Sequence, residues 1–159
     1  MAVTRPAIDL LPHRPPMRLV EEIAHLVPGE SARGRRVAHP DDWYFQGHFP
    51  DDAVVPAIVL VELLAQTGGI AACAALGDGG GSAERAARAL RVAALSNFRF
   101  PSTARPHAVL EAVAQVVGRM GGVVKIEGYV TADGVRVAAG EVTLAEKGGR
   151  EPFLREPTP

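Results

Sequence analysis

The sequence is poor in cysteine and in aromatic side chains, and its charges nearly cancel. Cys73 is the single cysteine among 159 residues, so the chain cannot form an internal disulfide, and one thiol cannot build a zinc site alone. Seventeen Lys and Arg against eighteen Asp and Glu give a formal net charge of -1. That balance argues against a nucleic-acid binder that works through bulk positive charge. Prolines and charges interrupt residues 1–16, so we expect no signal peptide there.

The remaining composition is that of an ordinary globular protein, with 47% hydrophobic and 22% charged residues. The length is close to the roughly 150 residues typical of one domain. We therefore predict a single domain over residues 1–159. Its core is expected over about 9–146, with a loose C-terminal tail over 147–159.

The longest apolar stretch follows Pro56 and reads AIVLVELLAQTGGIAACAAL over residues 57–76. A proline is tolerated at a helix start, and about 20 apolar residues would also suit a membrane span. Glu62 and Gln66 lie inside the stretch, however, and a central carboxylate is costly in a bilayer. The pattern therefore predicts a buried helix of a soluble domain and no membrane span.

The segments around this helix favour β-strands. Residues 17–27 could form a strand or a helical turn, whereas the later segments are rich in Val and Ile or alternate in polarity. Asp133-Gly134 is a strong hairpin signal between the last two of them. One long helix followed by an antiparallel meander predicts an α+β fold in which the sheet curls around the helix. The expected strands cover 31–38, before the helix, and 91–100, 108–120, 123–132 and 135–146, after it. A glycine-rich linker is expected at 77–82, directly after the helix.

The informative segment is QGHFPDDAVVPAIVLVELLAQ over residues 46–66. It places His48 in an aromatic loop and Glu62 on the apolar helix, 14 positions later, with Gln66 one turn further on the same face. We expect desolvation to raise the pKa of Glu62, so that the carboxyl group can donate a proton. A neutral histidine can accept one near neutral pH. The two residues are therefore a candidate acid and base.

This segment closely resembles the 3-hydroxyacyl-acyl-carrier-protein dehydratases of bacterial fatty-acid synthesis, the FabZ-like branch of the hotdog fold. The resemblance rests on GHFP at 47–50, Val55-Pro56 and ELLAQ at 62–66. LPHRPP at 11–16, with Leu19-Val20, resembles the N-terminal signature of the family, and NFRF at 97–100 is in the right place. The similarity covers roughly residues 9–146.

The resemblance implies a hydro-lyase without metal or organic cofactor. His48 would remove a proton from C2 of a 3-hydroxyacyl thioester. Glu62, supplied by the partner subunit of a dimer, would protonate the departing C3 hydroxyl, giving a trans-2-enoyl thioester and water. A backbone N–H at the start of the helix would polarise the thioester carbonyl. The implied substrate-binding residues are Gly47, Phe49, Pro56, Ala57 and Gln66, and Gln66 would either orient Glu62 or satisfy the backbone of a strand.

The same resemblance implies a cytoplasmic homodimer that acts on acyl-carrier protein, and it extends to a trimer of dimers. A narrow apolar tunnel along the helix would receive the acyl chain. Basic side chains could cluster to meet an acidic carrier, or could form an ordinary solvated surface. These are Arg33, Arg35, Arg36, Arg85, Arg88, Arg91 and Arg99.

Two departures from the family keep alternatives open. Ala57 stands where glycine is usual, and would strain the turn if that position needs a positive φ. The 105–108 segment, RPHA, replaces a usual Pro-Gly-Asp. The alternatives are an acyl thioesterase, in which the carboxylate activates water, and a non-catalytic acyl-binding subunit. Glu62 could also be a structural partner of a strand arginine, and we expect surface positions for His13, His25, His39 and His107.

Overall fold

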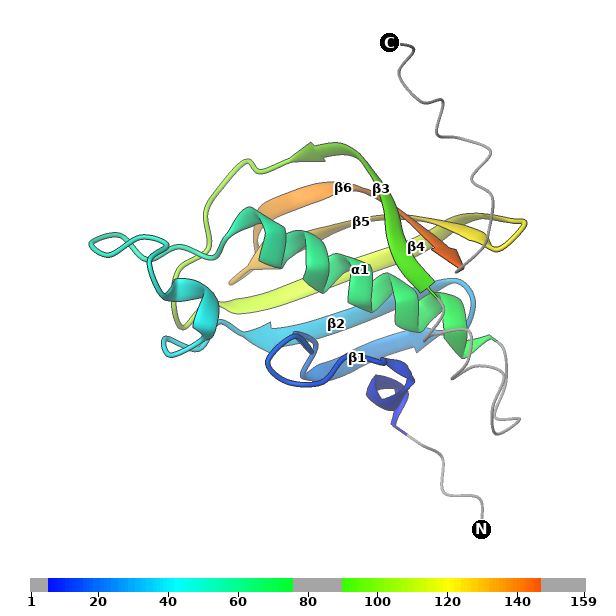
Figure 1. Ribbon diagram of the computed structural model, residues 1–159, viewed down its shortest axis with the longest axis horizontal. Coiled ribbons are helices and arrows are strands. Elements are labelled where there is room, and N and C mark those ends of the chain that lie inside the picture. Colours follow the sequence, from blue (N-terminus) through cyan, green and yellow to red (C-terminus); the bar gives the residue numbers. More distant parts are fainter. Residues whose placement is uncertain (1–5, 76–89, 147–159) are drawn as a thin grey trace.

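The fold is one antiparallel sheet curled around one long helix, as the sequence predicted (Figure 1). A computed structural model of the protein describes residues 6–75 and 90–146. The elements are η1 (Ala7–Leu10), β1 (Glu22–Val27), β2 (Ser31–Val37), η2 (Trp43–Phe45), α1 (Ala57–Ala74), β3 (Leu90–Arg99), β4 (Val109–Met120), β5 (Val123–Ala132) and β6 (Val135–Glu146). The six strands of the described residues follow the spatial order β1-β2-β4-β5-β6-β3, which puts β1 and β3 at the two edges. The predicted meander is correct for β4, β5 and β6 but wrong for β3, which pairs with β6 and not with β4.

The strand predictions are confirmed to within one residue for the five segments from 31 to 146. The ambiguous segment 17–27 is a strand only from Glu22 onward, and its first residues form no regular element. Residues 7–10 form a short 3-10 helix. The glycine-rich linker and the C-terminal tail lie outside the described residues.

Helix α1 is apolar enough and long enough to cross a membrane by composition alone, but 67% of its apolar window is buried inside the fold. The sheet curls around it, and Leu63, Leu64 and Ile70 are fully enclosed. A helix that is apolar almost all round is expected to be buried in this way. The predicted core helix is therefore confirmed, including its start directly after Pro56.

The two adjacent glycines of α1 occupy different environments, which gives a matched test of the packing. A Cβ at Gly68 would lie 2.7 Å from Cγ2 of Ile126 on β5, whereas a Cβ at Gly69 would first meet Leu144 at 3.8 Å. We expect Gly68→Ala to lower the free energy of unfolding by about 1–3 kcal/mol through overpacking. Gly69→Ala should leave it unchanged or raise it by up to about 1 kcal/mol, because alanine favours helix. Urea unfolding of both variants checks this, and equal effects would contradict the close approach of α1 to β5.

The aromatic loop before His48 packs against the domain. Tyr44 and Phe45 are buried in η2. Arg36 of β2 is 7% exposed and forms an ion pair with Asp42, whose carboxylate also accepts the hydroxyl hydrogen of Tyr44. Arg36 is therefore an anchor for this loop and is not available to a carrier protein, which corrects its place among the candidate surface arginines.

Candidate active site

His48 lies in a loop whose hydrogen bonds settle which ring nitrogen is free. Its Nδ1 is 3.0 Å from the carbonyl oxygen of Val54, and the N–H of Val54 donates back to the carbonyl of His48. A carbonyl oxygen can only accept, so Nδ1 carries the hydrogen, and Nε2 of a neutral ring is an acceptor. The ring of Phe49 stacks on the imidazole at 4.2 Å, and Gly47 takes a positive φ of 87° just before it. This half-buried ring can act as a base.

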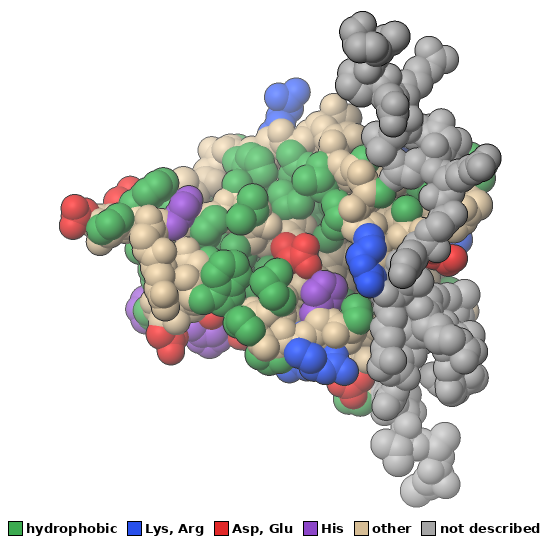
Figure 2. Space-filling model, in the orientation of Figure 1, with side chains coloured by type: hydrophobic (Ala, Val, Ile, Leu, Met, Phe, Trp, Pro, Cys, Tyr) green, Lys and Arg blue, Asp and Glu red, His purple; other side chains and the backbone are tan. Residues whose placement is uncertain are grey.

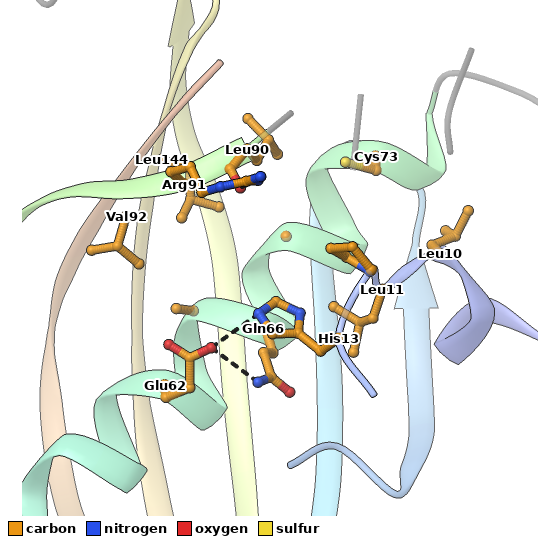
Figure 3. A pocket seen from close by; sticks show the side chains of 13 residues that line it. Leu10, Leu11, His13, Glu62, Gln66, Cys73, Leu90, Arg91, Val92 and Leu144 are labelled. Carbon is orange, nitrogen blue, oxygen red and sulfur yellow. Dashed lines mark hydrogen bonds and ion pairs between the residues drawn. The ribbon is translucent and has the colours of Figure 1, made fainter. Parts of the chain in front are cut away.

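Glu62 projects from α1 and is held through one of its two oxygens. Oε1 accepts a hydrogen bond of 3.0 Å from Nε2 of Gln66, one turn further along the helix (Figure 3). The same Gln66 amide donates to the carbonyl of Met17 and accepts from the N–H of Leu19. Gln66 thus holds Glu62 by a hydrogen bond, and the backbone that it satisfies is the segment before β1 and not a strand.

His13 is a site residue that the sequence prediction missed. We expected a surface histidine, but its Nε2 lies 3.2 Å from Oε1 of Glu62 (Figure 3). His13 and Glu62 line one pocket, which is described below. No described arginine pairs with Glu62, so the structural ion pair considered for it is absent from residues 6–75 and 90–146. No spacing rule links two residues so far apart in sequence. The one available signal was the position of His13 inside the LPHRPP signature.

The pKa of Glu62 is shifted opposite to the expectation. Burial raises it, as predicted, but the contacts with His13 and Gln66 and the charge of a protonated His13 outweigh burial, so the net pKa is lowered. The sequence could not show these two partners. The carboxyl group of Glu62 is therefore ionised more readily than that of a free glutamate.

A pocket of about 480 Å³ opens beside Glu62 and runs along α1. Its lining is mainly apolar, with Leu11 from the N-terminal segment, Val92 from β3 and Leu144 from β6 (Figure 3). Glu62 and Gln66 line it, but His48 does not. Nor do the other predicted substrate-binding residues, which lie in the loop and at the start of α1: Gly47, Phe49, Pro56 and Ala57.

The start of α1 tolerates alanine. Ala57 is the first helical residue after Pro56, and its φ is not positive. The backbone strain considered for an alanine at this position therefore does not arise. The N–H groups of Val59 and Leu60 reach the carbonyl of Pro56, whereas those of Ala57 and Ile58 have no backbone acceptor within the described part of the chain. Two free donors at a helix N-terminus can bind a developing negative charge.

Comparisons with known proteins agree with this picture. The family model described as "FabA-like domain" matches residues 11–141. A Bacillus subtilis (strain 168) protein named 3-hydroxyacyl-acyl-carrier-protein dehydratase FabZ is 30% identical over 145 residues, covering 91% of this chain and 98% of that protein. A Solibacter usitatus protein of the same name is 33% identical, covering 92% and 88%.

Solved structures show the same fold at low identity. A structure entitled "The Dehydratase Heterocomplex ApeI:P from Xenorhabdus doucetiae" matches with a TM-score of 0.70 at 16% identity, covering 91% of this chain and 92% of that one. A mutant of the phenylacetic acid degradation protein PaaI from Thermus thermophilus matches with a TM-score of 0.57, at 17% identity and covering 79% and 92%. Because the family model spans most of the chain and the FabZ proteins align along nearly all of it, the chain belongs to the FabA-like family.

Proposed function

We propose that this protein is a hydro-lyase that converts a 3-hydroxyacyl thioester on acyl-carrier protein into the trans-2-enoyl thioester and water. The observation that carries the proposal is the pair of groups with complementary proton chemistry: a histidine with Nε2 free and a carboxyl group beside an apolar pocket. The names of the similar proteins support this choice of substrate. The proposal extends to a role in fatty-acid synthesis in the cytoplasm.

In this mechanism Nε2 of His48 removes the proton from C2 of the substrate. The electron pair forms the C2–C3 double bond, and the C3–O bond breaks as Glu62 protonates the departing hydroxyl. The free N–H groups at the start of α1 donate to the thioester carbonyl, where negative charge develops. Gly47, Phe49 and Pro56 shape the entrance around His48, and Gln66 keeps Glu62 in place.

The reaction needs a second copy of the chain, because His48 does not line the pocket that holds Glu62. Strand β3 is at the sheet edge and pairs only with β6 among the described strands, and its Val92 and Leu95 are 44% and 50% exposed. Hydrophobic side chains also cover much of the face of the molecule that carries α1 (Figure 2). An apolar edge strand of this kind favours pairing with its own copy. Val92 also lines the pocket, so a homodimer interface formed by β3 would lie directly beside the site. The trimer of dimers stays a prediction from the family.

The first test is mass spectrometry of a 3-hydroxyacyl group on acyl-carrier protein after incubation with the native protein. We expect the loss of one water from the acyl group, with the thioester intact. Release of a free acid would favour the thioesterase alternative. Tight binding without any change in mass, from a folded dimer, would favour the non-catalytic acyl-binding subunit.

A further inference from the structure

We propose that His13 is a positioning residue which holds a proton for Glu62 and delivers it as the substrate hydroxyl departs. The two residues then act as one acid, in which Glu62 touches the substrate and His13 acts through it. This inference rests on the proposed dehydration and adds a third residue to it.

The geometry separates the two carboxylate oxygens of Glu62. His13 and Gln66 both contact Oε1, at 3.2 and 3.0 Å, whereas no described residue donates a hydrogen bond to Oε2. Oε2 is therefore the oxygen left for the substrate hydroxyl, and Oε1 is the oxygen through which a proton can be supplied. A carboxyl group that is contacted at one oxygen and free at the other can accept a proton on the first side and donate one to the substrate on the second.

The surroundings of His13 argue against a purely structural ring. Its Nδ1 is shut off from solvent and has no hydrogen-bond partner among the described residues, so Glu62 is the one polar group the ring serves. The backbone beneath it is fixed, because the guanidinium of Arg14 donates to the carbonyls of Leu11 and His13. A ring present only for packing would gain nothing from a buried nitrogen without a partner.

The other charged or titratable groups of the pocket do not replace His13. Arg91 of β3 lines it and stays positively charged. Burial raises the pKa of Cys73, further along α1, to about 11, so the thiol keeps its proton. Gln66 does not titrate. Among the described residues that line the pocket, His13 is the one histidine, and an imidazole is the side chain best suited to holding and releasing a proton.

The protons balance over one turnover. The proton from C2 moves to Nε2 of His48. The proton on Nε2 of His13 moves to the carboxylate of Glu62, which gives one proton to the departing hydroxyl, and the hydroxyl leaves as water. The enzyme ends with one proton more on His48 and one fewer on His13, and exchange with solvent restores both.

The test compares the pH dependence of kcat/KM, from about pH 6 to about pH 9, for native protein, His13→Gln and His39→Gln. Glutamine can still donate to Oε1 but cannot carry the proton. We expect His13→Gln to fall roughly tenfold or more below native protein at the alkaline end, and the difference to shrink toward acid pH, because solvent then protonates a larger fraction of Glu62 in the variant. His39 forms the matched exposed pair with Glu21, 2.8 Å apart, and its variant should follow the native profile throughout.

Thermal unfolding and the mass of the assembly show whether each variant is folded, and His13→Asn is a second neutral replacement if His13→Gln is not. A loss of the same factor at every pH would assign His13 a structural role and overturn the inference. So would an unchanged profile. Absence of turnover in native protein is a different outcome, because it overturns the proposed function itself and the inference with it.

Discussion

Replacing His48 with asparagine is expected to lower kcat for dehydration by about 10²–10⁴-fold, the usual contribution of a general base. The side-chain amide of asparagine can still donate to the carbonyl of Val54, as Nδ1 of His48 does at 3.0 Å. It has no equivalent of Nε2, which is the atom proposed to accept the C2 proton. The variant therefore separates loss of the base from collapse of the loop. The measurement is the single-turnover rate of enoyl formation on acyl-carrier protein.

His25→Asn is the control for this substitution, since it replaces an exposed histidine of β1 that lies outside the pocket. Its rate should equal that of native protein. His48→Ala should lose activity to the same extent as His48→Asn and should also be less stable, because the bond to Val54 is lost. A His48→Asn protein that keeps its rate would remove His48 from the role of base.

Glu62→Gln is expected to lower kcat by a similar factor, because glutamine keeps the size of the side chain but cannot give up a proton to the hydroxyl. The variant should stay folded, since Glu62 is only partly buried and Gln66 keeps its bonds to Met17 and Leu19. Glu21→Gln provides the control, as Glu21 is the carboxylate of the other histidine pair and lies outside the Glu62 pocket. Equal rates for Glu62→Gln and native protein would contradict the acid assignment.

Co-expression of the two inactive chains tests whether the site is shared between subunits. In a mixed dimer, the Glu62→Gln chain supplies an intact His48 and the His48→Asn chain supplies an intact Glu62. Random association would then restore about a quarter of the native sites, because half of the dimers are mixed and each has one intact site. If both residues act within one chain, no activity returns. Dimers purified through two different affinity tags give the clearest measurement.

The secondary structure was largely predictable because its signals are local. The alternation along 123–132 and 135–146 and the Asp133-Gly134 turn define β5 and β6, and the apolar run after Pro56 defines α1. The uncertain segment was 17–27, where a short mixed pattern suits two structures. Pairing with β2 over Glu22–Val27 decided it, and this is a contact between neighbouring strands.

The site was predictable only in part. The spacing of Glu62 and Gln66 on one helix face is a local property, and their hydrogen bond follows from it. The fixed tautomer of His48 depends on a loop closed by Val54, and the partnership of Glu62 with His13 depends on how the N-terminal segment crosses α1. Neither contact has a periodic signal in the sequence.

The sequence by itself determined the helix, the strands that curl around it and the two candidate proton-transfer residues, because periodicity and motif spacing are written along the chain. Only the tertiary structure decided the direction in which the pKa of Glu62 is shifted. Burial and two hydrogen-bonding neighbours pull its pKa in opposite directions, and the neighbours prevail because folding brings His13 to within 3.2 Å of the carboxylate.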